Sequence, residues 1–244
     1  MRHLALALSF LTIIPVRVAA PGPGDIGRAA IWFPFVGLII GAILAGANYG
    51  LSLIFQPSLV AGVIVALWAA ITGGLHLDGF ADCCDGLFAA VTSERRLEIM
   101  RDPRLGSFGV IGLGLLLALK IAALTTVLLE SPLPAVSALL LTPAIARWLI
   151  LIVALQPSAR PGGLGSDFAL GLRPHVFILA AIAPLALTIV FFNSRTMIAV
   201  AVAHLVAVGV ILLARARLGG VTGDVFGMTV ETAEAAMLLV FAAN

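Results

Sequence analysis

Six apolar stretches, each long enough to cross a membrane as a helix, constrain the fold of this chain more than any other feature. They cover residues 29–55, 57–75, 106–129, 133–155, 175–192 and 196–214. A helix needs about 20 mainly apolar residues to cross the hydrocarbon core of a bilayer. Because 61% of the 244 residues are hydrophobic and only 11% are charged, the composition favours a membrane protein over a soluble domain of this size. We predict an all-α, polytopic membrane bundle with about six to seven transmembrane helices.

The two ends of the chain leave the number of spans open. Residues 1–16 begin like a signal peptide, but no small-x-small cleavage site follows the apolar run directly. We interpret this segment as a retained interfacial or re-entrant one. Residues 229–243 form a shorter apolar stretch, a seventh span if they cross. Turn residues such as Gln56-Pro57 and Asn193-Ser194 separate the spans, which predicts antiparallel helix pairs within a single domain, residues 1–244.

The arginines predict which side each loop faces. If the spans are correct, one side of the membrane receives segments 1–28, 76–105, 156–174 and 215–228. These segments hold Arg2, Arg17, Arg28, Arg95, Arg96, Arg101, Arg104, Arg160, Arg173, Arg215 and Arg217. The turns on the other side hold only Arg195. Since basic loops stay in the cytoplasm, we expect a bacterial inner-membrane protein whose active site faces the cytoplasm. The net charge of +2 gives no indication of nucleic-acid binding.

Three aspartates follow the second span at helical spacing. Asp78, Asp82 and Asp85 lie at i, i+4 and i+7 with no basic residue between them, so on a helix they share one stripe. Three like charges beside a membrane repel one another, and a divalent cation would relieve that repulsion. Carboxylate ligands favour Mg²⁺ or Mn²⁺ over zinc. We predict a metal site here; the alternative is a solvated acidic helix face.

Several neighbours of the aspartates have both a structural and a functional interpretation. The glycines at 74, 79 and 86 weaken a helix, and they suggest that something bulky approaches the backbone. His76 points away from the stripe, and local packing and substrate contact are equally good interpretations. Cys83 and Cys84 are too few for a disulfide framework and are expected to be free packing residues.

Three other polar positions are candidates for phosphate or ligand contact. Arg101 and Arg104 could pair with phosphate oxygens, and free amides at a helix start near Ser107 could add to that site. The alternative is a basic loop that only sets topology. Asp224 stands among four glycines, which suggests a backbone close to a ligand. Arg147, inside a span, needs an anionic partner, and a substrate phosphate or the aspartate cluster would serve.

At these residues the chain resembles the cobalamin synthase family, also called adenosylcobinamide-GDP ribazoletransferase. The resemblance rests on three motifs in the expected order, at residues 73–86 (GGLHLDGFADCCDG), 101–109 (RDPRLGSFG) and 219–231 (GGVTGDVFGMTVE). The family more often has Lys-Asp-Ser-Arg where this chain has Arg101-Asp102-Pro103-Arg104. A weaker resemblance to the CDP-alcohol phosphotransferase signature keeps the aspartate spacing but not the order of its halves.

The resemblance implies a Mg²⁺-dependent enzyme that joins adenosylcobinamide-GDP to α-ribazole or its 5′-phosphate and releases GMP. Asp78, Asp82 and Asp85 would bind the metal, with Asp82 or Asp85 as the base. The candidate substrate-binding residues are then His76, Arg101, Asp102, Arg104, Ser107, Arg147, Asp224 and Glu231. Expected partners are the two substrates and membrane lipid, with self-association or other cobalamin-assembly enzymes left open. Two alternatives remain, a CDP-alcohol-type phosphotransferase that makes a lipid and a cation-coupled transporter.

Overall fold

The computed structural model describes residues 2–130, 132–160 and 162–243, and its regular elements are helices. In chain order they are α1 (Arg2–Leu11), α2 (Asp25–Ala29), a 3-10 turn η1 (Ala30–Trp32), α3 (Phe33–Ser52), α4 (Pro57–Ile71), α5 (Leu75–Phe88), α6 (Ser93–Ile99), α7 (Ser107–Leu129), α8 (Pro132–Val153), α9 (Leu164–Gly171), α10 (Pro174–Ala180), α11 (Ile182–Val190), α12 (Ser194–Leu218) and α13 (Gly223–Phe241). The predicted all-α class is confirmed.

Four helical stretches in the described part of the chain are individually long and apolar enough to cross a membrane. They are Asp25–Ser52, Ser107–Leu129, Pro132–Val153 and Ser194–Leu218. Two helix pairs reach that length only together, Pro57–Ile71 with Leu75–Phe88, bent by 92°, and Gly165–Gly171 with Pro174–Val190, bent by 93°. The chain therefore has four such spans, or up to six if each bent pair counts as one.

The prediction of one continuous span over residues 57–75 is wrong. Helix α4 ends at Ile71, and Gly73 and Gly74 follow with φ angles of 61° and 70°. These left-handed conformations are readily adopted by glycine and interrupt a right-handed helix. The chain consequently turns before α5 begins, so that the aspartates lie on a separate helix.

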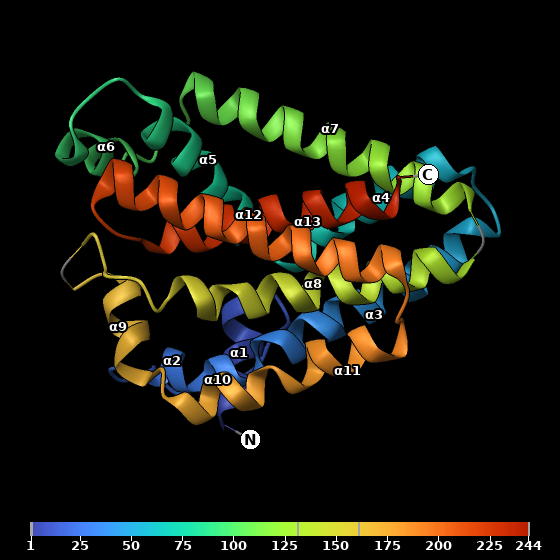
Figure 1. Ribbon diagram of the computed structural model, residues 1–244, viewed down its shortest axis with the longest axis horizontal. Helices are drawn as coiled ribbons and strands as arrows, with labels where there is room; N and C mark the ends of the chain where they lie inside the picture. Colours follow the sequence, from blue (N-terminus) through green and yellow to red (C-terminus); the bar gives the residue numbers. More distant parts are fainter. Residues whose placement is uncertain (1, 131, 161, 244) are drawn as a thin grey trace.

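The segment at 229–243 belongs to α13, which lies inside the bundle. This helix contacts α5, α7, α8 and α12, and most of its residues are buried. In Figure 1 it runs alongside α12, among the other long helices. It is not among the four individually apolar spans, because Asp224, Glu231 and Glu234 interrupt its apolar sequence.

Three of the loops that the arginine pattern places on one side, those around α6, before α9 and after α12, lie at one end of the bundle (Figure 1). Arg160 donates to the carbonyl of Leu97, and Ser158 forms a β-bridge with Val221, so the loops around α6, before α9 and after α12 are in contact. At the other end, Arg195 lies 2.8 Å from Glu130 and donates to the carbonyl of Phe241. The predicted separation of the loops into two groups is therefore present in the fold.

Small residues in the first long span let α3 and α8 pack closely. A Cβ atom on Gly37 would collide with the Pro143 carbonyl, and one on Gly41 with the Leu139 carbonyl. Gly46 and Gly50, farther along α3, face open space. Close backbone approach at the first two positions lets dispersion forces join the helices where lipid offers no hydrophobic driving force.

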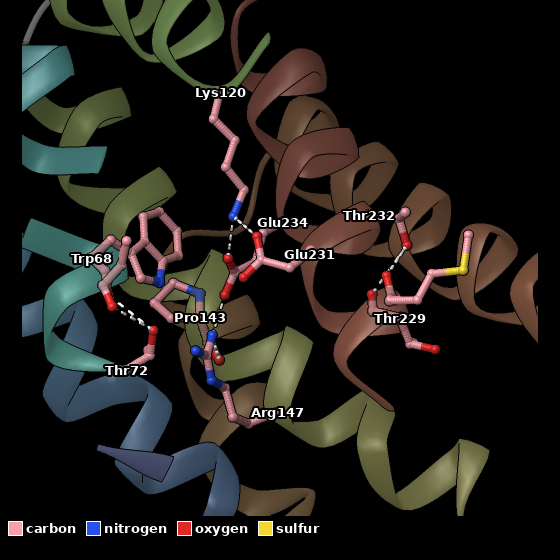
Figure 2. Close-up of polar contacts among 11 residues, drawn as sticks. Trp68, Thr72, Lys120, Pro143, Arg147, Thr229, Glu231, Thr232 and Glu234 are labelled. Carbon is pink, nitrogen blue, oxygen red and sulfur yellow. Dashed lines mark hydrogen bonds and ion pairs between the residues drawn. The ribbon is translucent and has the colours of Figure 1, made fainter. Parts of the chain in front are cut away.

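Four buried charges tie three helices together in the interior of the bundle (Figure 2). Lys120 of α7 lies 2.5 Å from Glu231 and 2.6 Å from Glu234, both on α13. The guanidinium of Arg147 on α8 pairs with the other oxygen of Glu234. The Lys120 ammonium also lies 5.0 Å from the ring centroid of Trp68 on α4. Two positive and two negative charges balance, so no unpaired charge is left in a region of low dielectric.

The two-ended arrangement predicts how cysteines introduced into loops will be labelled. We expect that Glu98→Cys, in a variant without Cys83 and Cys84, resists an impermeant thiol reagent in intact cells and reacts after permeabilisation. Ser194→Cys, exposed at the opposite end, is the matched control and should react in intact cells. Strong labelling of Glu98→Cys from outside would reverse the orientation.

The charge balance predicts how the network responds to substitution. Lys120→Met leaves two buried carboxylates with one arginine, and unpairing a buried charge costs about 3–5 kcal/mol in soluble proteins. We expect a loss of stability of that order on SDS-induced unfolding in mixed micelles. Lys120→Met combined with Glu231→Gln restores neutrality and should recover most of it. If Lys120→Met alone is as stable as the parent protein, the proposed charge balance is wrong.

Candidate active site at the crossing of α5 and α13

The aspartates on α5 are positioned by a close crossing between α5 and α13. A Cβ atom on Gly79 would lie 3.0 Å from the Cα atom of Asp224, and one on Gly227 would lie 2.8 Å from the His76 carbonyl. A larger residue at Gly227 would force the backbone to shift, and one at Gly79 would require the neighbouring backbone to give by a few tenths of an ångström. The bulky group expected near Gly79 is therefore the α13 backbone. The crossing brings Asp224 beside the aspartates of α5.

A second contact fixes the segment that leads into α13. Val221 donates to the Pro157 carbonyl, and Ala159 donates to the Val221 carbonyl, both at 2.9 Å. Gly219 ends α12 in a left-handed conformation with φ 77°. These backbone bonds hold the 157–160 segment against the start of α13, so its side chains face the crossing.

A cavity of about 210 Å³ lies at this crossing. Its polar and charged lining residues are His76, Asp78, Ser158, Arg160, Thr222 and Asp224. A second hollow of about 800 Å³ adjoins it, lined by Asp82, Arg101, Asp102 and Arg104 among others. Asp78 lines both. The two hollows together are lined by carboxylates and guanidiniums, a combination suited to a metal and a phosphate.

Negative charge at the crossing is only partly compensated. The pKa of Asp82 is raised to about 7, mainly by burial of its carboxyl group. The negative charges of the neighbouring Asp224, Asp78 and Asp85 add to this effect. Burial also raises the pKa of Asp224, against the opposing effect of Arg160. A carboxylate is easier to protonate when its charge lacks a partner. The site would therefore favour a bound cation.

Asp85 is turned away from this cavity toward the start of α7. Its Oδ2 accepts from the Gly106 amide at 2.8 Å, and its Oδ1 accepts from the Gly109 amide at 2.9 Å. Cβ atoms on either glycine would collide with this carboxylate. Two amides that we predicted to be free for a phosphate are thus taken by Asp85. The predicted metal and base roles of Asp85 stay predictions, but they would compete with this helix cap.

Oxygen ligands for Mg²⁺ are present, although the predicted group of three is not assembled. Within the described residues no three His, Cys, Asp or Glu side chains are close enough to hold a metal ion together. Mg²⁺ is commonly held by only one or two carboxylates together with substrate phosphates and water. Asp78 and Asp82 meet that smaller requirement, and the raised pKa of Asp82 shows charge that a cation could neutralise.

The basic loop before α7 carries its own ion pair. Arg104 lies 2.6 Å from Asp102 and donates to it through Nε as well, which lowers the pKa of Asp102 to about 2. Arg101, Arg104 and Ser107 are exposed. The three candidate substrate-binding residues thus lie at the mouth of the larger hollow or beside it, where their contribution to substrate binding stays a prediction.

The remaining candidates lie deeper than expected. Arg147 pairs with Glu234 rather than with the aspartate cluster, and its contact with a substrate phosphate stays a prediction. Glu231, a candidate substrate-binding residue, is paired with Lys120. His76 is almost fully buried, yet it lines the smaller cavity, so both of its interpretations stay open.

Sequence reasoning missed Arg160, which was counted only as a topology signal. Its Nη1 lies 3.4 Å from Asp224 Oδ2, and its Nη2 donates to the Leu97 carbonyl at 3.0 Å. It lies in the cavity wall beside Ser158. The one available signal was the Pro-Gly-Gly that follows Arg160, a pattern typical of a shaped loop.

Comparisons with known proteins agree with the motifs. A model of the cobalamin-5-phosphate synthase family matches residues 3–242. Proteins named adenosylcobinamide-GDP ribazoletransferase are similar over nearly the whole chain. The protein of this name from Pseudomonas paraeruginosa (strain DSM 24068 / PA7) is 40% identical, and the matched region covers 99% of this chain and 98% of the relative. That of Thiobacillus denitrificans (strain ATCC 25259 / T1) is 42% identical, covering 98% and 94%. That of Roseiflexus sp. (strain RS-1) is 38% identical, covering 95% and 86%. No solved structure matches. The chain therefore belongs to the cobalamin-5-phosphate synthase family.

Proposed function

We propose that this protein is the adenosylcobinamide-GDP ribazoletransferase of its organism. It joins adenosylcobinamide-GDP to α-ribazole or its 5′-phosphate and releases GMP. The observation that carries the proposal is the crossing of α5 and α13, where two family motifs contribute Asp78, Asp82 and Asp224 to adjoining hollows. The named relatives, similar over nearly their whole length, do not favour a lipid-making phosphotransferase or a transporter.

The sizes of the hollows fit a large substrate held only by its reactive part. Pockets that enclose a drug-sized ligand measure about 300–1,000 Å³, and the cavity at the crossing is about 210 Å³. This cavity would hold a phosphate group and the substrate atoms bonded to it. The adjoining hollow of about 800 Å³ would take the nucleotide or the ribazole, while the corrin ring stays outside.

In the proposed reaction the ribazole 3′-oxygen attacks the phosphorus that carries the aminopropanol arm. The bond from this phosphorus to the bridging oxygen breaks, and GMP leaves with that oxygen. Asp82 lines the larger hollow and would accept the hydroxyl proton there if it is not itself a metal ligand, because a bound cation would lower the basicity of its carboxylate. Asp78 and Asp82 would hold Mg²⁺, which supplies charge neutralisation at the pyrophosphate. Arg101 and Arg104, at the mouth, would attract the nucleotide phosphates.

The orientation and partners follow from the same proposal. We propose that the end holding the crossing faces the cytoplasm of a bacterial cell, with the spans in the inner membrane. The loops at that end carry most of the arginines. Nucleotide-activated substrates are cytoplasmic, whereas the apolar helix faces contact lipid. Self-association and contacts with other cobalamin-assembly enzymes stay open alternatives.

We predict that Asp78→Asn and Asp82→Asn each lower the rate of GMP release about a thousandfold or more, because each removes a charged oxygen from the proposed metal site. Their stability should be kept or raised, since one of several mutually repelling charges is gone. The measurement is GMP release by purified protein with both substrates at limiting Mg²⁺. Glu94→Gln, an exposed acid at the same end, is the control and should keep its activity.

Asp85→Asn separates the two roles of the third aspartate. An amide side chain has one acceptor oxygen and cannot cap both Gly106 and Gly109 as the carboxylate does. We expect a lower melting temperature together with a smaller loss of rate than in the other two variants. A thousandfold loss at unchanged stability would instead identify Asp85 as a metal ligand or base. Near-normal rates in both Asp78→Asn and Asp82→Asn would contradict the proposed site.

A further inference from the structure

Arg160 reaches the catalytic cavity from a loop that links three parts of the fold. It precedes α9, and its guanidinium extends to Asp224 on α13 and to the Leu97 carbonyl on α6. Its side chain is 15% exposed. Of the described residues that line the 210 Å³ cavity, it is the only arginine or lysine. Its positive charge lines the same cavity as Asp78, where the proposed metal would bind.

The present contacts of Arg160 leave much of its binding capacity unused. A guanidinium has five N–H donors in a planar fork. The distance of 3.4 Å to Asp224 is long for a charged pair, and Nε is buried without a protein partner. By contrast, Arg104 engages Asp102 through two nitrogens, at 2.9 and 2.6 Å. Arg160 could therefore donate shorter and more numerous hydrogen bonds to another anion than it does to Asp224.

The arrangement sets Asp224 and an incoming phosphate in competition for one guanidinium. Planar bidentate binding of a phosphate by arginine is stronger than a single long contact. When the phosphate takes the fork, Asp224 is released toward the metal side of the cavity. Removing Asp224's charge should therefore help phosphate binding when no cation is present.

We propose that Arg160 binds a phosphate group of the nucleotide-activated substrate and exchanges its contact with Asp224 for phosphate oxygens. The inference rests on the proposed function. The alternative is that Arg160 only anchors its loop to α6 and α13, in which case its loss and the loss of Asp224 should have the same effect.

GMP binding to purified protein in detergent with EDTA tests the exchange, by titration calorimetry and with guanosine as the phosphate-free comparison. We expect Arg160→Gln to weaken GMP binding about tenfold or more and to leave guanosine binding unchanged. Arg160→Lys, which keeps the charge but not the fork, should lie between. Asp224→Asn should bind GMP more tightly than the parent. Arg173→Gln, an exposed arginine in the following segment, is the control and should bind as the parent does.

The proposal is overturned if the parent shows no GMP binding, if Arg160→Gln binds GMP as the parent does, or if Asp224→Asn weakens binding as Arg160→Gln does. Since Arg160→Lys retains the charge, it also tests the fork should Arg160→Gln not fold. The proposed function fails separately, if the parent with Mg²⁺ releases no GMP from adenosylcobinamide-GDP and α-ribazole while the binding pattern holds.

Discussion

The close crossing of α5 and α13 is the contact on which the site depends. Two glycines, Gly79 and Gly227, allow the two backbones to approach so closely that a Cβ atom would collide on either side. The approach places Asp224 next to Asp78 and Asp82, although they are far apart in the sequence. Without it, the aspartates of α5 would face the loop before α7 alone. The carboxylates of the proposed site are therefore gathered by backbone packing, and substitution of either glycine is expected to displace the site as a whole.

The buried ion pairs explain how α13, a helix with acidic residues, can lie in the interior of a membrane bundle. Glu234 is fully buried, which is costly for a carboxylate unless positive charges neutralise it. Lys120 and Arg147 supply those charges from two different spans. The network therefore fixes α13 against α7 and α8. Since the same helix carries Asp224 at its start, neutralising the bundle interior also positions the site at its end.

Local patterns in the sequence predicted most of the helices and the aspartate segment, because apolar length and i, i+4 spacing are properties of a single element. They could not predict contacts between distant elements. The pairing of Arg147 with Glu234, 87 residues apart, and the capping of α7 by Asp85, depend on how helices pack. The break before α5 was visible in Gly73 and Gly74, but its 92° angle was not. Arg160 was missed because the sequence around a loop arginine is the same whether the residue only sets the membrane topology or lines a cavity.

The position of a bound divalent cation would show directly whether the crossing of α5 and α13 is the metal site. Mn²⁺ scatters anomalously and can replace Mg²⁺ at oxygen sites, so crystals of the protein with Mn²⁺ and GMP would locate the metal. The account predicts one strong anomalous peak at the crossing of α5 and α13, within coordinating distance of Asp78 and Asp82. A peak beside Asp85 at the start of α7, with none at the crossing, would contradict it.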